Sequence, residues 1–198
     1  DWSSDVCSSD LMEHGSQGVL LLPGPPRELG PMLTGAMDAF LAPRGGRRVV
    51  RQVIRMTGRG ESSIDAILQP WYAQWRDRAV PVRATILASM GQIELHLSAV
   101  DADVATATSA VEVAVREAVE AVGRDVFSQH GETLEQVVGA ILTARGWKVA
   151  LAESCTGGLI AERVTSVAGA SRYFDQAVVT YSNAAKTAWL DVPPVLLA

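Results

Sequence analysis

The sequence predicts a multidomain fold that combines α+β and α/β architecture. The first observation is an alternation at 47–57, followed by a helical pattern and by two more predicted strands at 82–89 and 92–100, of which the second alternates between apolar and polar residues. This β-α-β-β-α order predicts an antiparallel sheet with helices on one face. The second observation is that helical patterns alternate with short apolar runs after residue 131, which is typical of a parallel α/β sheet.

The N-terminal region predicts one strand and one helix. Residues 18–22 form an apolar run bounded by glycine and proline, which indicates a buried strand. The Pro-Gly-Pro-Pro sequence at 23–26 prevents the strand from continuing, and a helix is expected from Arg27 to about Leu41. A cluster of glycine, proline and arginine at 43–46 predicts a domain boundary.

The middle region gives the clearest strand pattern. Glycines and serines at 58–63 predict a turn into a helix, and Met90-Gly91 predicts the turn between the two later strands. Asp101 is expected to cap a final helix that runs to about Val122.

The C-terminal region begins after a short linker at 129–131. Gly146 is expected to stop its first helix. The predicted elements are helices at 132–145, 156–167 and 184–190 and strands at 148–152 and 177–181.

Composition excludes several classes of protein. Residues 1–11 lack periodicity and resemble the translation of a sequencing adapter, so we expect them to be a scar outside the fold. The whole chain has a net charge of -5. Without residues 1–11, which contain three aspartates, 17 basic and 19 acidic residues remain, so the rest of the chain is close to neutral. This charge gives no electrostatic reason to expect binding to nucleic acid or to an anionic membrane. Outside the scar Cys155 is the single cysteine, which fits a reducing cytoplasm. No apolar run approaches the roughly 18 residues that span a bilayer, and no signal peptide is readable.

The strongest chemical signal is the Ala-Glu-Ser-Cys-Thr-Gly-Gly sequence at 152–158. It places Ser154 at the expected carboxyl edge of a sheet, where α/β folds bind ligands. The N–H groups of the expected helix can stabilise an oxyanion or hold a phosphate, and Gly157 and Gly158 allow a close approach. The alternative is that Ser154 only caps the helix.

A serine nucleophile needs a base to take its proton. None of the three histidines lies nearby in sequence, so Lys186 is the candidate base, with Tyr181 as a relay. A lysine acts as a base only when its pKa is lowered. The plainer alternatives are a solvated Lys186 and a Tyr181 that only packs. No His/Cys/Asp cluster has the spacing of metal ligands.

These residues carry a family resemblance. The sequence at 152–158, with Tyr-Ser-Asn-Ala-Ala-Lys at 181–186, resembles the C-terminal domain of the CinA family, the competence/damage-inducible proteins. Proteins with this domain act as nicotinamide-nucleotide amidases. The sequence at 21–28 resembles the end of the family's N-terminal domain, which has a molybdopterin-binding fold and in some members is an ADP-ribose pyrophosphatase. Gly60-Glu61-Ser62 resembles the start of the connecting KH-like domain.

The resemblance implies a domain order and a site. The domains would be a molybdopterin-binding-like piece at 12–46, a KH-like α+β domain at 47–128 and the start of an α/β amidase domain at 129–198. The amidase would hydrolyse nicotinamide mononucleotide in pyridine-nucleotide salvage without a metal or redox cofactor, and a homodimer is allowed. The implied catalytic residues are Ser154, Tyr181 and Lys186, and the implied substrate contacts are Glu153, Thr156, Gly157, Gly158 and Asn183.

Departures from the family pattern leave alternatives open. Ala184 stands where the family usually has glutamate, and a glycine pair is missing near Gln176. A downstream Gly-rich segment and most of the N-terminal domain are also missing, so we expect truncation at both ends. One alternative is an ADP-ribose pyrophosphatase that uses a divalent metal, and another is a non-catalytic nucleotide-binding module.

Individual residues also keep alternative roles. Asn183 is either a helix cap or a substrate contact, and Glu153 either orients Lys186, binds substrate or only ends a strand. Cys155 is expected to be a small buried residue rather than a reactive thiol. The sequence at 58–61 lacks the Gly-x-x-Gly clamp of RNA-binding KH modules, so no nucleic acid is expected.

Overall fold

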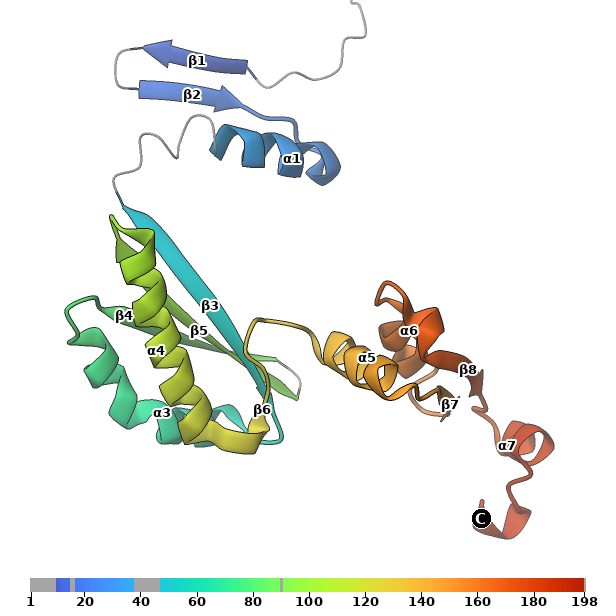
Figure 1. The fold of residues 1–198 in the computed structure, drawn as a ribbon. Coiled ribbons are helices and arrows are strands. Elements are labelled where there is room, and N and C mark those ends of the chain that lie inside the picture. The colour runs from blue at the N-terminus through green and yellow to red at the C-terminus, as the bar shows by residue number, and fades with distance from the viewer. Residues whose placement is uncertain (1–9, 15–16, 38–46, 90, 198) are drawn as a thin grey trace, which may run out of the picture.

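A computed structural model describes residues 10–14, 17–37, 47–89 and 91–197 (Figure 1). These residues form a mixed α/β structure, as predicted, with three separate sheets in the described ranges. The assignment of these parts to named domains, and the boundaries between them, stay predictions.

The N-terminal part is a hairpin followed by a helix. Strands β1 (Asp10–His14) and β2 (Gln17–Leu21) pair antiparallel, and helix α1 (Pro26–Ala36) follows. Strand β1 was not predicted, and its first two residues, from the segment expected to be a scar, pair with Leu21 and Leu20. The expected helix end near Leu41 and the boundary at 43–46 lie outside the described residues.

The middle part has the predicted β-α-β-β-α order. Its antiparallel sheet has the strand order β4-β5-β3-β6. Helix α4 packs over β3 and β5, and α3 packs over β4. The elements are β3 (Arg48–Thr57), α3 (Glu61–Arg76), β4 (Val82–Ser89), β5 (Gln92–Asp101), α4 (Val104–Val122), the short 3-10 turn η2 (Gly123–Asp125) and β6 (Val126–Ser128).

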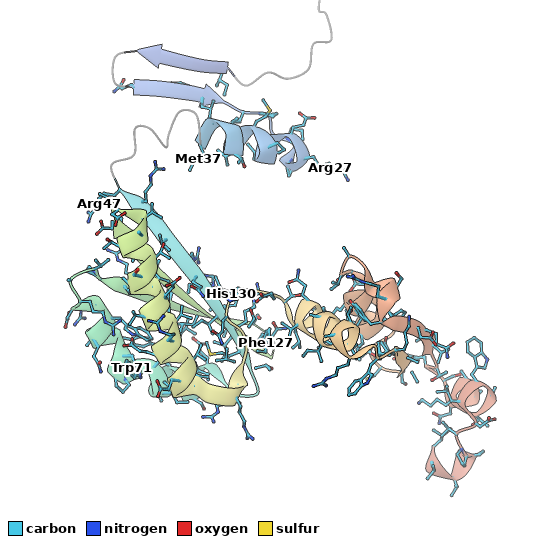
Figure 2. The ribbon with its side chains drawn as sticks, in the orientation of Figure 1. Arg27, Met37, Arg47, Trp71, Phe127 and His130 are labelled. Carbon is cyan, nitrogen blue, oxygen red and sulfur yellow. The ribbon has the colours of Figure 1, made fainter. Side chains whose placement is uncertain are left out.

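The main hydrophobic core lies between this sheet and its two helices. Ile54, Leu95 and Leu97 project from the strands, and Leu68 and Trp75 meet them from α3; all five are fully buried. The indole Nε1 of Trp75 donates to Glu117 Oε2 at 2.8 Å, so its one polar group is satisfied. Trp71, which is labelled in Figure 2, stacks on Trp75 with ring centroids 6.2 Å apart, so both tryptophans of α3 serve packing.

Two details of this part differ from the prediction. Asp103, not Asp101, caps α4, because its carboxylate accepts from the N–H groups of Ala105 at 3.2 Å and Thr106 at 3.1 Å. Asp101 instead accepts from the N–H of Asp103. Strand β6 was missed, since three residues are too few for an alternating pattern to be recognised.

The C-terminal part is a pair of parallel strands with helices. The predicted helix stop is confirmed, since Gly146 has φ 65° and ends α5, and Thr133 and Gln136 form a capping box at its start. The predicted parallel pairing is also confirmed, by β7 and β8. The elements are α5 (Leu134–Arg145), β7 (Val149–Glu153), α6 (Leu159–Thr165), η3 (Ala170–Arg172), β8 (Phe174–Val179), α7 (Asn183–Leu190) and η4 (Pro194–Leu196).

Candidate active site

The candidate site lies where β7 and β8 end. The strands run parallel with Glu153 opposite Val179, so Ser154 and Thr180 leave the sheet at the same edge. The N–H of Thr180 donates to the carbonyl oxygen of Glu153 at 2.8 Å, which holds the two strand ends together. The predicted placement of Ser154 at the carboxyl edge is therefore confirmed.

Glu153 holds the beginning of α6. Glu153 is 3% exposed, and its carboxylate accepts from the backbone N–H groups of Gly158 at 3.1 Å, Ile160 at 3.1 Å and Ala161 at 2.8 Å. Burial raises the pKa of this carboxyl, but these bonds and one from the Thr156 side chain outweigh burial, so the pKa lies below its ordinary value of 4.5. Glu153 is therefore ionised at neutral pH and acts as the cap of α6.

This arrangement corrects one expectation about the oxyanion donors. Helix α6 begins at Leu159 rather than Thr156, and residues 155–158 form a turn. The amides at the start of α6 were expected to face a ligand, but those of Ile160 and Ala161 donate to Glu153. The helix began later than predicted because Gly157 and Gly158 adopt left-handed conformations, with φ 62° and 98°.

The turn after Ser154 offers other donors. Ser154 is half-buried and its carbonyl oxygen accepts from the N–H of Gly157 at 3.0 Å. Within the described ranges, the N–H groups of Cys155 and Thr156 donate to no protein acceptor. Both residues are exposed, so the expectation that Cys155 is buried was wrong. Two unpaired amides therefore follow the Ser154 hydroxyl directly.

Tyr181 lies just before α7, and Asn183 and Lys186 belong to that helix. The N–H of Ala185 donates to Ser182 Oγ at 3.1 Å, so Ser182 is the cap and Asn183 is the first helical residue. Lys186 Nζ donates to Asn183 Oδ1 at 3.4 Å, and Asn183 Nδ2 donates to the Leu197 carbonyl at 3.2 Å. The Tyr181 side chain is 71% exposed.

The structure thus brings together only part of the predicted set. Ser154, Glu153, Thr156 and the two glycines share one turn. No hydrogen bond among the described residues joins Ser154 to Tyr181 or Lys186. Sequence reasoning missed the unpaired amides of Cys155 and Thr156, and the pair of glycines was the signal that a turn, not a helix, follows Ser154.

Two further properties bear on function. The described residues contain no group of three or more His, Cys, Asp or Glu side chains that could hold a metal ion. None of the described helices is both long and apolar enough to cross a membrane.

The fold and the site define a mixed α/β protein with a serine-bearing turn at the carboxyl edge of two parallel strands. Residues 131–198 match the family model of the CinA C-terminal domain, and this part of the chain belongs to that family.

Named relatives agree with this assignment. The chain is 42% identical over 180 residues to a CinA-like protein of Koribacter versatilis, a match that covers 90% of the chain and 42% of the relative. It is 40% identical over 193 residues to a putative competence-damage inducible protein of Moorella thermoacetica, covering 95% of the chain and 45% of that protein. The chain thus spans less than half the length of these curated relatives.

A solved structure is also similar in sequence. The competence damage-inducible protein A of Klebsiella pneumoniae is 41% identical over 32% of this chain and 40% of its own. Its TM-score is 0.32, which is too low to argue a shared overall fold.

Proposed function

We propose that this protein hydrolyses the carboxamide of nicotinamide mononucleotide to nicotinate mononucleotide and ammonia, with Ser154 as the nucleophile. The observation that carries the proposal is the turn at the end of β7, where the Ser154 hydroxyl is followed by two unpaired amides. Membership of the C-terminal segment in the CinA family supports the reaction class.

The chemistry follows from these groups. Ser154 Oγ attacks the carboxamide carbon and loses its proton to Lys186 Nζ, directly or through Tyr181. The N–H groups of Cys155 and Thr156 donate to the oxyanion that forms. The carbon–nitrogen bond breaks, the leaving nitrogen takes the proton and departs as ammonia, and water then hydrolyses the acyl-serine ester.

The substrate contacts are divided between the turn and α7. Thr156, Gly157 and Gly158 would contact the nucleotide, because the exposed turn allows close approach to its backbone. Asn183 would bind from α7. Glu153 takes the role of a positioning residue in this proposal, since its carboxylate already holds the turn and α6.

One step requires a contact beyond those described. Lys186 Nζ must come within hydrogen-bond reach of Ser154 Oγ or of the Tyr181 hydroxyl. Catalytic hydrogen bonds are often long before substrate binds and tighten only in the complex. The amidase therefore needs α7 to approach the serine turn when the nucleotide is bound.

The test is ammonia release from nicotinamide mononucleotide by this chain and by its Ser154→Ala variant. Ser171→Ala, an exposed serine in η3, is the matched control. We expect release by the parent and the control and none by Ser154→Ala, with calorimetric binding of the nucleotide retained.

Two other results would favour the alternatives. Binding of the nucleotide without ammonia release by the folded parent would indicate a non-catalytic nucleotide-binding module. Release of AMP from ADP-ribose that depends on a divalent metal, without amidase activity, would indicate the pyrophosphatase.

A further inference from the structure

A cavity lies where the middle part of the chain meets the C-terminal part. Its volume is about 450 Å³, which is within the range of about 300–1,000 Å³ typical of small-molecule sites. One wall is β6 with the linker that follows it, and the other is a face of α5, which lies beside β6. Phe127 and His130, which are labelled in Figure 2, belong to the first wall. We call this space the junction cavity.

Both walls of the junction cavity have an apolar part. Phe127 is half-buried on β6, and Val137 and Ile141 lie four residues apart on α5, which places them on one helical face. The side chain of Ile141 is 44% exposed, so apolar surface of the cavity is in contact with water. A ligand with an apolar ring would therefore gain free energy by covering this surface.

One ionised acid supplies the charge of the junction cavity. The Ser128 hydroxyl donates to Glu132 Oε2, and this bond is the main reason that the pKa of Glu132 lies below its ordinary value of 4.5. Glu132 is therefore ionised at neutral pH. None of the described residues that line the cavity is a lysine or an arginine, so the cavity favours a cation over an anion.

Contacts with β3 hold the linker wall in place. Gln52 Nε2 donates to the carbonyl oxygen of Gln129 at 2.8 Å and lies 3.5 Å from His130 Nδ1. Gly131 has φ 85°, and a β carbon there would lie 3.6 Å from the β carbon of Val53. The wall that carries Glu132 is therefore positioned before any ligand binds.

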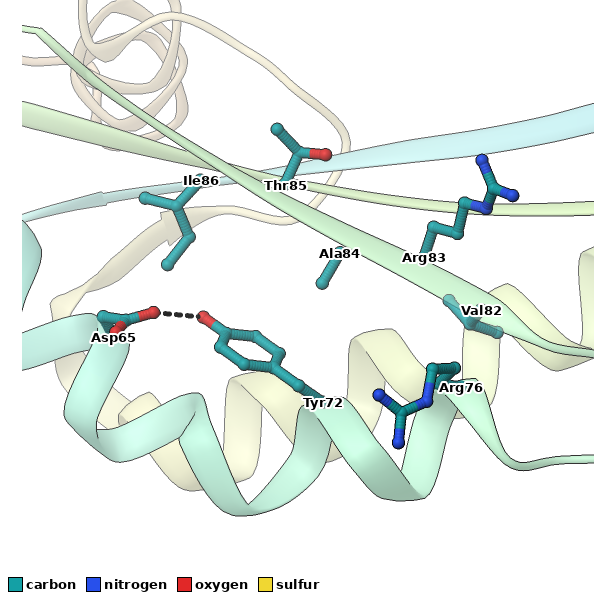
Figure 3. Close-up of a pocket in the computed structure, with 8 residues that line it drawn as sticks. All are labelled: Asp65, Tyr72, Arg76, Val82, Arg83, Ala84, Thr85 and Ile86. Carbon is teal, nitrogen blue, oxygen red and sulfur yellow. Dashed lines mark hydrogen bonds between the residues drawn. The ribbon is translucent and has the colours of Figure 1, made fainter.

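The groove between α3 and β4 differs from the junction cavity in its charge (Figure 3). It is lined by the carboxylate of Asp65, which accepts from the Tyr72 hydroxyl at 2.9 Å, and also by the guanidinium of Arg76. Because charges of both signs line that groove, it favours neither cations nor anions. The junction cavity has a single sign of fixed charge beside an aromatic ring.

We propose that the junction cavity binds a small planar organic cation, of the pyridinium or guanidinium class, at Phe127 and Glu132. The face of a phenylalanine ring attracts a cation, and the carboxylate pairs with its charge. A planar delocalised cation is favoured over a primary ammonium because it is more weakly hydrated, so it loses less hydration free energy beside the apolar wall. The proposal does not depend on the amidase, because no lining residue belongs to the site around Ser154.

The test is a titration of the chain, labelled with nitrogen-15, in which backbone amide chemical shifts are followed by NMR at about pH 8, where an ordinary imidazole is uncharged. The cationic probes are 1-methylpyridinium and methylguanidinium, and pyridine is the neutral counterpart. We expect saturable shifts of the Phe127, His130 and Glu132 amides with at least one cation. Pyridine should bind at least about tenfold more weakly. The cation that binds more tightly identifies the class of ligand.

Two variants separate the contribution of the ring from that of the charge. Phe127→Leu removes the ring and keeps an apolar side chain, whereas Glu132→Gln removes the charge and keeps an acceptor for the Ser128 hydroxyl. Each should weaken binding of the cation at least about threefold. Glu112→Gln, which changes an exposed acid of α4 outside the cavity, is the matched control and should leave binding unchanged.

Three results would overturn the proposal: no saturable shifts at the junction cavity, equal binding of pyridine and the cations, or unchanged binding in either variant. Circular dichroism of each variant separates loss of binding from loss of folding. Failure here would leave the amidase proposal intact, and absence of ammonia release would leave this one intact, because the two rest on different residues and different measurements.

Discussion

Glu153 Oε1 accepts a 2.8 Å hydrogen bond from the N–H of Ala161, which ties the last residue of β7 to the first turn of α6. The segment between them contains Ser154, Cys155 and Thr156. Because the buried carboxylate also binds the N–H groups of Gly158 and Ile160, both ends of this segment are fixed. The geometry of the candidate nucleophile therefore depends on a neighbouring acid that need not touch substrate.

The first prediction concerns the ionisation of Glu153. Its pKa is lowered in the folded state, so its contribution to stability is present above its ordinary pKa of 4.5 and is lost as pH falls through the lower, folded value. Glu153→Gln should lower the stability of the chain at about pH 7, and the difference from the parent should shrink below about pH 4. Chemical denaturation across this range measures both.

Glu162→Gln is the control for this prediction. Glu162 is exposed on the same helix, so its replacement should change stability little at any pH. A constant difference between Glu153→Gln and the parent across the pH range would show that the carboxylate charge is not what holds α6.

The second prediction concerns the proposed base. Arginine keeps the positive charge of Lys186 but does not lose its proton in a protein, so it cannot act as a base. Lys186→Arg should lower kcat for ammonia release by about 10²–10⁴-fold with a much smaller change in KM. Steady-state kinetics on nicotinamide mononucleotide give both constants.

Lys148→Arg serves as the comparison, because its amine contacts the Ser171 carbonyl rather than the residues around Ser154. It should leave the kinetics unchanged. Near-normal turnover by Lys186→Arg would exclude Lys186 as the base and move attention to Tyr181.

The third prediction tests the packing of α5 on the chain before β8. A β carbon at the buried Gly139 would lie 2.6 Å from the Tyr173 hydroxyl oxygen and 2.7 Å from its Cζ, closer than atoms can pack. Tyr173 is itself buried, so Gly139→Ala should destabilise the protein by about 1–3 kcal/mol. Thermal unfolding followed by circular dichroism measures the change.

Gly35→Ala in α1 supplies the contrast, because a β carbon there meets no atom within 4 Å. It should be neutral or stabilise by up to about 1 kcal/mol, since alanine favours helix. If Gly139→Ala behaved in the same way, the close packing of Tyr173 against α5 would be wrong.

The fourth prediction compares two valines of one helix. Val111 is 1% exposed and Val104 is 49% exposed, and both belong to α4. Val111→Ala should cost about 2 kcal/mol, because two methyl groups leave the core and a cavity remains. Val104→Ala should stay within about 0.5 kcal/mol. Equal effects in urea denaturation would mean that α4 does not pack as described.

Much of the architecture could be read from the sequence because it depends on local patterns. Alternation at 92–100 marked a strand whose Ile93, Leu95 and Leu97 do face the core, and Gly146 marked a helix end that requires a left-handed residue. The same reasoning placed Ser154 just after a strand, since an apolar run that ends in polar and glycine residues is a local signal.

Tertiary structure decided what local patterns could not. The role of Glu153 depends on amides that the turn at residues 155–158 brings to its carboxylate. The residues next to Glu153 in the sequence do not show whether this carboxylate caps a helix or contacts a ligand. The short β6 forms only because β3 is present to pair with it.

The groove between α3 and β4, which Asp65 and Arg76 line, likewise forms only when α3 packs on the sheet. The order of residues determines which backbone conformations are locally favourable. Contacts between distant segments depend instead on how those segments pack. The role of Glu153, the amides that it binds and the groove beside β4 are all results of that packing.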